Sequence, residues 1–249
     1  IGVEAMNEVR IREFLFPCLE KLKIRLSDEQ YGQLDRLASA MLSDPMYKSV
    51  SKIFDPYEMA MKHFLDSLAP VCFNLPLWKS ATIVDLGTGG GFPSLPLAVA
   101  LPQSRIIAID SRQKSVEFVA RMAEAAGLSN VQTFHARIEE VGRDAKFREK
   151  ADLVVCRALS AVRTLVEYTM PLTRTGGYAL YYKGPKLDEE LAESVNAFAV
   201  FSVAVENVEI LRLAPPELPF ERNFLVLRKT CAVPERYPRK CGLAVEKPL

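Results

Sequence analysis

A glycine-rich segment, VDLGTGGGFP at positions 84–93, constrains the fold of this chain more than any other feature. It follows an apolar run at 81–85 that predicts a strand and precedes a run at 93–101 that predicts a helix. Glycines at such a junction let the backbone turn sharply and approach a ligand closely. The spacing from Gly87 is GxGxG, and Phe92 occupies the place of the third glycine in a dinucleotide fingerprint. There is no GK[ST] ending, which argues against a P-loop.

Two acidic residues accompany this loop. Asp85 lies two residues ahead of Gly87, and Asp110 ends the next predicted strand, 23 residues after Gly87. A carboxylate at the position of Asp110 can accept hydrogen bonds from ribose hydroxyls. Asp85 can face an ammonium group, as in the zwitterionic, phosphate-free S-adenosylmethionine. A nicotinamide-dependent oxidoreductase, or a glycine turn with unrelated acids, stays open as an alternative on this pattern alone.

Predicted strands and helices alternate after residue 80, which indicates a parallel sheet covered on both faces. The last two predicted strands have no helix between them and suggest an antiparallel pair at one edge. The pattern predicts an α/β fold of the Rossmann-like class I S-adenosylmethionine-dependent methyltransferase type, with a seven-stranded, mostly parallel sheet. The predicted strands are 81–85, 105–109, 131–134, 152–156, 178–182, 201–208 and 224–228, and the predicted helices are 93–101, 114–126, 163–170 and 187–198.

The chain is expected to have three parts. Residues 1–78 read as an N-terminal helical segment packed on the core, in which Ser27 and Gln30 form a capping box. Residues 79–230 read as the S-adenosylmethionine-binding domain, and residues 231–249 as a basic tail.

Composition excludes several classes of protein. The five cysteines form no CxxC pair and the chain has two histidines, so neither a disulfide framework nor a metal site is expected. Apolar stretches are far too short for a membrane span, and the first residues lack the apolar core of a signal peptide. These features predict a cytoplasmic protein with no metal and no membrane association, and we expect a monomer.

Several segments resemble the RsmG (GidB) family of bacterial 16S ribosomal RNA guanine-N7 methyltransferases. The resemblance runs from about residue 55 to the C-terminus. It rests on DLGTGGGFPSLPLA at 85–98, HFLDSL at 63–68, ARIEE at 136–140, CRA at 156–158, YKG at 182–184 and RYPRK at 236–240. The resemblance implies S-adenosylmethionine as cofactor, and 16S ribosomal RNA or the small ribosomal subunit as partner.

The resemblance also implies site residues. It places cofactor contacts on Gly87 and Phe92 in the loop, on Ile138 and Glu139 after the third strand, and on Arg157 after the fourth. The loop pattern itself adds Asp85, Gly89, Gly91 and Asp110. Arg157 is expected to position the reactants, and no general base is expected, because guanine N7 carries a lone pair and no proton. Cys156, His63 and His135 are interpreted as structural.

An RNA surface must come from local clusters, because the net charge is only +1. Residues 157–186 hold five cationic side chains against one acid, and residues 221–249 hold seven against three, so each segment carries +4. Phosphate contacts of this kind position RNA. The residues predicted to bind RNA are Arg163, Lys183, Arg236, Arg239 and Lys240; charges on an ordinary solvated surface are the alternative.

Three functions therefore fit the sequence. The first is methylation of guanine N7 in 16S ribosomal RNA. The second is S-adenosylmethionine-dependent methylation of a protein or a small molecule. The third is a non-catalytic ribosome-binding module that keeps the cofactor fold, which the intact glycine loop disfavours.

Overall fold

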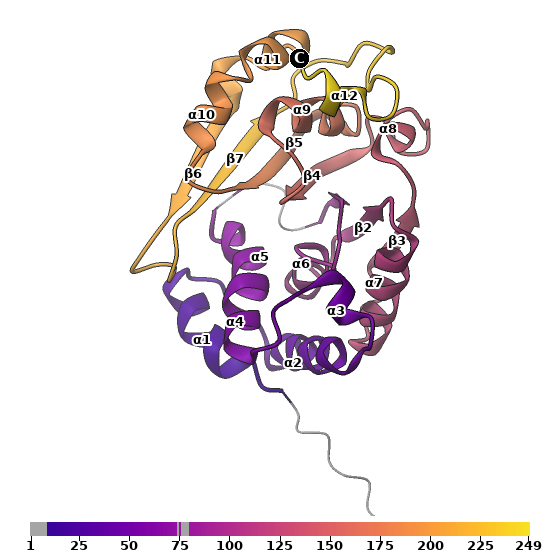
Figure 1. Cartoon of the computed structure of the whole chain (residues 1–249). Coiled ribbons are helices and arrows are strands. Elements are labelled where there is room, and N and C mark those ends of the chain that lie inside the picture. Colours follow the sequence, from indigo (N-terminus) through magenta and orange to yellow (C-terminus); the bar gives the residue numbers. More distant parts are fainter. Residues whose placement is uncertain (1–8, 74, 76–79) are drawn as a thin grey trace, which may run out of the picture.

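A seven-stranded sheet forms the centre of the computed structural model, which describes residues 9–73, 75 and 80–249 (Figure 1). The strand order is β3-β2-β1-β4-β5-β7-β6. Strands β1 to β5 pair in parallel, and β7 runs antiparallel to both β5 and β6. The strands are β1 (Thr82–Leu86), β2 (Arg105–Asp110), β3 (Val131–His135), β4 (Ala151–Arg157), β5 (Thr173–Lys183), β6 (Val208–Leu213) and β7 (Arg222–Arg228). The predicted mostly parallel sheet with an antiparallel edge pair is confirmed.

One face of the sheet packs against the N-terminal helices together with α6 and α7 (Figure 1). Successive residues of a strand point to opposite faces, so Ile83 and Leu153 lie in this core. The elements on this face are α1 (Arg12–Lys21), α2 (Asp28–Ser43), α3 (Tyr47–Val50), α4 (Pro56–Met59), the π-helical η1 (Ala60–Leu65), α5 (Asp66–Leu68), the 3₁₀ turn η2 (Ala69–Cys72), α6 (Ser94–Ala100) and α7 (Gln113–Ala125).

The opposite face carries a second apolar core, to which Val84 and Val154 contribute. The elements there are α8 (Ile138–Val141), α9 (Val162–Thr169), α10 (Leu187–Ala192), α11 (Val195–Val200), the 3₁₀ turn η3 (Val205–Asn207) and α12 (Leu243–Glu246). Figure 1 shows these helices above the sheet and α1–α7 below it.

Helix α2 begins at the predicted capping box. The Gln30 amide donates to Ser27 Oγ over 3.2 Å, and the Ser27 amide donates to Gln30 Oε1 over 2.8 Å. The Gln30 side chain also donates to the carbonyl of Val99 over 2.7 Å and so ties α2 to α6. Arg121 on α7 pairs with Asp44 at 2.8 Å. The N-terminal helices thus share their core with the sheet, while both residues of the predicted boundary at 78/79 lie outside the described residues.

A π-helical turn lies within the helical segment 56–68. α4, η1 and α5 follow one another without a break, and η1 covers Ala60–Leu65. Such turns occur often at functional sites, because the extra residue re-aims the side chains beside it. Here the turn holds Lys62 and His63, and Asp66 follows it directly.

Two predictions on the last third of the chain were wrong. The segment 201–208 is an irregular connection rather than a strand: Ser202 has φ +53°, and Phe201 packs against Tyr237 with 4.9 Å between ring centroids. Phe201 and Val203 therefore fill the core without pairing to a neighbouring strand. The predicted helix 187–198 is two helices, and Ser194 between them bonds through its hydroxyl to the Glu190 carbonyl at 2.6 Å, a local interaction that competes with helix continuation.

The C-terminal segment is fastened to α9 and to the loop after α8. Arg239 donates to the buried carboxylate of Glu167 on α9, with a shortest distance of 2.6 Å. Arg143 donates to the carbonyl of Pro238 over 2.7 Å, and Arg148 to that of Tyr237 over 2.7 Å. The predicted free RNA contact at Arg239 is therefore corrected, because its guanidinium is used inside the protein.

We predict that Arg239→Ala lowers the free energy of unfolding by about 3 kcal/mol, because it leaves the buried Glu167 carboxylate with only the backbone N–H of residue 239. The matched control is Arg236→Ala, an exposed arginine three residues away, which should change stability by less than about 0.5 kcal/mol. Urea unfolding measures both. Equal, small effects would show that Glu167 finds other donors.

Candidate active site

The glycine loop connects β1 to α6 at the carboxyl end of the sheet, where open α/β folds bind ligands. Gly87, Gly89 and Gly91 have φ of +70°, +56° and +86°, a region that side chains disfavour. A Cβ at Gly87 would lie 2.7 Å from Cδ1 of Leu159, and one at Gly91 would overlap the side chain of Leu95. The backbone conformation therefore favours glycine at all three positions, and the available space does so at Gly87 and Gly91.

Asp85 is buried beneath this loop, with 1% of its surface exposed. Neither of its carboxylate oxygens has a hydrogen-bond partner among the residues that the structure describes. The nearby hydroxyls of Thr88 and Ser94 bond to each other at 2.6 Å. Burial raises the pKa of Asp85 to about 6, while those hydroxyls and the charge of Arg157 oppose the rise. A buried carboxylate without a hydrogen-bond partner is suited to bind a cationic group of a ligand.

Asp110 closes the far side of the loop, at the end of β2. Its Oδ2 accepts from the amide of Gly89 at 2.9 Å, and its Oδ1 accepts from the amide of Arg112 at 2.8 Å. These bonds fix the carboxylate against the loop. An ionised carboxylate has about four acceptor positions, so Asp110 keeps acceptor capacity for a ligand.

Ile138 and Glu139 open α8 just after β3, as the pattern predicted. The Glu139 carboxylate, however, turns towards the C-terminal segment: its Oε1 accepts from the amide of Gly242 at 2.9 Å and from the hydroxyl of Tyr168 at 3.3 Å. The carboxylate is thus occupied within the protein, and the cofactor contact at Glu139 stays a prediction. The backbone amides in the first turn of α8 have no acceptor within the helix, so they are available to contact a ligand.

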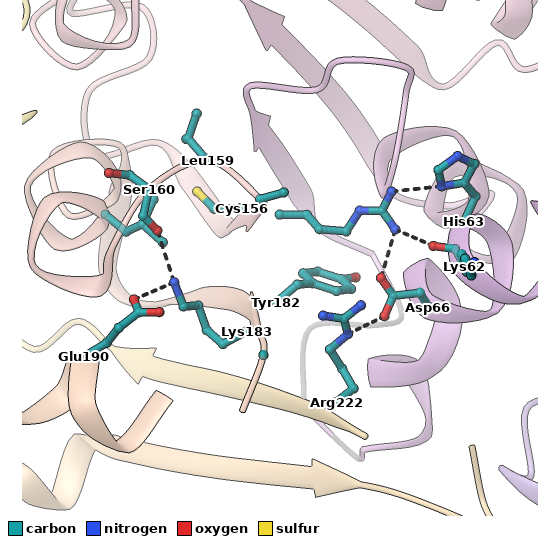
Figure 2. A pocket seen from close by; sticks show the side chains of 14 residues that line it. Lys62, His63, Asp66, Cys156, Leu159, Ser160, Tyr182, Lys183, Glu190 and Arg222 are labelled. Carbon is teal, nitrogen blue, oxygen red and sulfur yellow. Dashed lines mark hydrogen bonds and ion pairs between the residues drawn. The ribbon is translucent and has the colours of Figure 1, made fainter. Parts of the chain in front are cut away.

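Arg157 ends β4 and is held by the N-terminal segment. Its Nη1 donates to Asp66 Oδ2 over 2.9 Å and to the Lys62 carbonyl over 3.1 Å. Asp66 is 1% exposed and also accepts from Nε of Arg222 at 2.6 Å, as Figure 2 shows. One buried carboxylate thus fixes two guanidinium groups from β4 and β7.

His63 lies between Arg157 and the glycine loop. Its ring stacks on Phe92 with 4.4 Å between centroids and an interplanar angle of 18°. Its Nδ1 lies 3.3 Å from Nη2 of Arg157, and its Nε2 lies 2.9 Å from the hydroxyl of Ser51. Because arginine can only donate, Nδ1 is the acceptor and His63 is neutral. Burial, and next the Arg157 charge, lower the pKa of His63 to about 4.

A cavity of about 370 Å³ opens beside Arg157 (Figure 2). Tyr182 and Lys183 at the end of β5 line it, and Ala158 lines it with φ +52°. Strained backbone of this kind is concentrated at functional sites. Lys183 pairs with Glu190 at 2.6 Å and donates to the carbonyl of Ser160 over 3.1 Å.

Some residues of this cavity were not predicted as site residues. His63 was interpreted as structural, and Asp66, Tyr182 and Arg222 were not assigned to the site. The segment HFLDSL at 63–68, one of those that carry the family resemblance, could have drawn attention to His63 and Asp66. The sequence does not show, however, that these two residues lie beside Arg157 at the end of β4.

The five predicted RNA-binding residues divide into two groups. Arg163, Lys183 and Arg239 pair with acids of the protein, whereas Arg236 and Lys240 are exposed. Lys183 is 9% exposed and faces the cavity rather than solvent. Arg163 pairs with Glu193 at 3.3 Å. Arg236 and Lys240 are exposed, and neither makes an ion pair within the described part of the chain, so they remain predicted phosphate contacts.

Other chemistry is sparse around the site. Burial raises the pKa of the Cys156 thiol well above its ordinary value, which makes it a core residue rather than a nucleophile. Over residues 9–73, 75 and 80–249, no group of three or more possible metal ligands gathers. Across the same residues, no helix is long and apolar enough to cross a bilayer.

We predict that Asp85→Asn changes the pH dependence of stability. The folded pKa of Asp85 is raised from 3.8 to about 6, so its carboxylate destabilises the fold progressively as pH rises through that window. A pKa difference of about two between the folded and the unfolded protein corresponds to about 3 kcal/mol in the free energy of unfolding. Relative to the variant, the wild type should lose about this much stability between pH 4 and pH 7, as measured by urea unfolding without ligand. A constant difference would mean that a donor already compensates the carboxylate.

Comparisons with known proteins agree with this geometry. A solved structure described as a SAM-dependent methyltransferase from Aquifex aeolicus covers 72% of this chain and 96% of its own at 17% identity, with a TM-score of 0.50. A predicted O-methyltransferase from Agrobacterium tumefaciens covers 68% of this chain and 81% of its own at 18% identity, also with a TM-score of 0.50. These likenesses concern the fold.

Sequence relatives are much closer. Ribosomal RNA small subunit methyltransferase G of Exiguobacterium sp. is 37% identical and covers 98% of this chain and 100% of its own length. The protein of the same name from Lactobacillus johnsonii is 36% identical and covers 93% of this chain and 96% of its own. The model of the GidB family, rRNA small subunit methyltransferase G, matches residues 33–218. This chain therefore belongs to the GidB family of small-subunit ribosomal RNA methyltransferases.

Proposed function

We propose that this protein transfers a methyl group from S-adenosylmethionine to N7 of a guanine in small-subunit ribosomal RNA. The observation that carries the proposal is an intact glycine loop over the unpartnered carboxylate of Asp85, beside a cationic cavity, in a chain that matches its rRNA methyltransferase relatives over nearly its whole length. The 16S specificity and the N7 position rest on the family resemblance.

The residues fit S-adenosylmethionine. Its ammonium group would satisfy the buried Asp85 carboxylate, which has no partner within the described residues. The side-chain-free backbone of Gly87, Gly89 and Gly91 would let the methionine part approach closely. Asp110 would accept from the ribose hydroxyls, and the amides at Ile138 and Glu139 would contact the adenine. When bound, the cofactor supplies a methyl group on a positively charged sulfur.

The protein's contribution is alignment and electrostatics. Guanine N7 has a lone pair and no proton to remove, so the residues need no general base, and His63 is free to serve as an acceptor for Arg157. Arg157 would act as a positioning residue at the junction of the two ligands. Holding reactants in line can lower a barrier by up to about 7–11 kcal/mol in favourable systems. The electrostatic part would be the attraction of the four cations in the cavity wall, which outnumber its two acids, for the RNA phosphates.

RNA recruitment completes the proposal. Lys62, Arg222 and Lys183 line the cavity with Arg157, which suits a nucleotide whose phosphates are anionic. Arg236 and Lys240 would add phosphate contacts from the C-terminal segment. Contacts of this kind position the RNA and carry no sequence information.

The direct test is transfer of a labelled methyl group from S-adenosylmethionine to unmodified small-subunit RNA and to small subunits, followed by nucleoside analysis. We expect labelled 7-methylguanosine. Label in another nucleoside, or in protein, would contradict the proposed position or acceptor.

We predict that Gly87→Ala weakens S-adenosylmethionine binding at least about tenfold, because the new Cβ meets Leu159 at 2.7 Å and residue 87 has φ +70°, a conformation that costs a non-glycine residue about 1 kcal/mol or more. Gly90→Ala is the matched control: a Cβ there finds its nearest atom at 3.5 Å and no positive φ. Calorimetric titration measures affinity, and circular dichroism checks the fold. Equal affinities in the two variants would remove the loop from the cofactor site.

A further inference from the structure

A second cavity lies at the opposite end of the strands from the glycine loop. It has a volume of about 290 Å³ and is lined by the amino ends of β1, β2 and β4 and by the loop that follows α8. Its floor is apolar, made by Val84, Ile107 and Ala151. This volume is at the lower end of ligand pockets, which span about 300–1,000 Å³, and suits a single nucleotide rather than a larger ligand.

Three cationic side chains line this cavity, namely Arg105, Lys146 and Lys150, and no acid does. None of the three makes an ion pair within the part of the chain that the structure describes. All three are exposed, so each can reach an anion from solvent. In a chain with a net charge of +1, such a local excess is a specific feature of this surface.

The acids nearest in sequence are already engaged. Asp152 accepts from Nε of Arg174 at 2.6 Å and from the amide of Thr82 at 2.8 Å. Glu149 pairs with Lys229 at 2.5 Å. Asp144 accepts from the amide of Lys146 at 2.8 Å but keeps its charge, because a backbone amide is neutral. Within the described residues, three cations thus stand against one unpaired acid beside the cavity, and a net positive charge is left for a ligand.

An aromatic wall completes the cavity. Phe147 is half-buried and packs edge-on against Phe134, with 5.1 Å between centroids and an interplanar angle of 81°. The ammonium group of Lys146 lies 4.8 Å from the Phe134 ring centroid and 5.3 Å from that of Phe147. Cations beside an aromatic ring are the combination with which proteins hold the phosphates and bases of single-stranded RNA.

We propose that this cavity binds an unpaired nucleotide of the RNA substrate, remote from the reacting guanine. Its phosphate would contact Lys146, Lys150 and Arg105, and its base would lie against Phe147. The inference rests on the proposed function for its ligand. Because the cavity lies at the amino ends of the strands and the reaction site at their carboxyl ends, the RNA must extend past the sheet edge to reach both.

The charge test compares Lys146→Glu/Lys150→Glu with the matched control Lys21→Glu/Arg25→Glu, which makes the same change in net charge at exposed positions around the end of α1. Fluorescence anisotropy measures affinity of the full chain for a single-stranded fragment of small-subunit RNA at several salt concentrations. We expect the cavity variant to bind at least about tenfold more weakly, with a salt slope reduced by about 0.7 for each lost phosphate contact. The control should stay within about twofold of the wild type. Equal weakening in both variants, or in neither, would overturn the proposal.

The base contact has its own test. Phe147→Leu keeps an apolar side chain but removes the ring, and we expect about fivefold or greater loss of RNA affinity, because base–aromatic stacking contributes to the binding of single-stranded nucleic acids. Photo-crosslinking with 4-thiouridine RNA should label residues 146–150. Unchanged affinity in this variant, or crosslinks only elsewhere, would overturn the nucleotide assignment.

These readouts separate the two proposals. Normal RNA methylation with unchanged RNA affinity in the cavity variant would refute the cavity alone. Absence of methyl transfer by the wild type, with RNA affinity lost only in the cavity variant, would refute the proposed reaction alone. Calorimetric affinity for S-adenosylmethionine should be the same in all variants.

Discussion

The buried carboxylate of Asp66 is the interaction on which the site depends. It comes from α5, in the N-terminal segment, and it contacts Arg157 from β4 at 2.9 Å and Arg222 from β7 at 2.6 Å. A buried charge is costly unless it is paired and hydrogen-bonded, so these three side chains constrain one another. The N-terminal helices therefore form a wall of the active site and are not only a cover for the sheet.

The C-terminal segment has a comparable role on the other side of the site. Glu167 holds Arg239, and Glu139 accepts from the amide of Gly242. Glu139 follows directly after the third strand, beside the proposed adenine position. The segment that looked like a free basic tail thus supports the first turn of α8, while Arg236 and Lys240 stay exposed.

Ion pairing lowers the positive charge that the cationic segments of this chain present to an anionic partner. Cations such as Arg163, Arg174 and Lys183 have acidic partners that lie elsewhere in the sequence. A count of the charged residues within one segment therefore overestimates the positive charge at its surface, because it leaves out the acids from other segments. Lys146 and Lys150 make no ion pair within the described residues, although Asp144 and Glu149 lie beside them in the sequence.

The local pattern of the chain determined the strand–loop–helix unit at residues 82–100, the parallel order of the central strands and the places of Asp85, Asp110 and Arg157, because periodicity and glycine spacing act over a few residues. The tertiary structure alone decided which distant groups meet. Phe201 and Val203 look like strand residues but fill a core without pairing, and Arg239 looks like a surface cation but completes a buried pair with Glu167. His63 and Asp66 reach Arg157 only because α4, η1 and α5 pack beside the end of β4. Such contacts join residues more than 70 positions apart, and their geometry depends on packing that no short sequence window encodes.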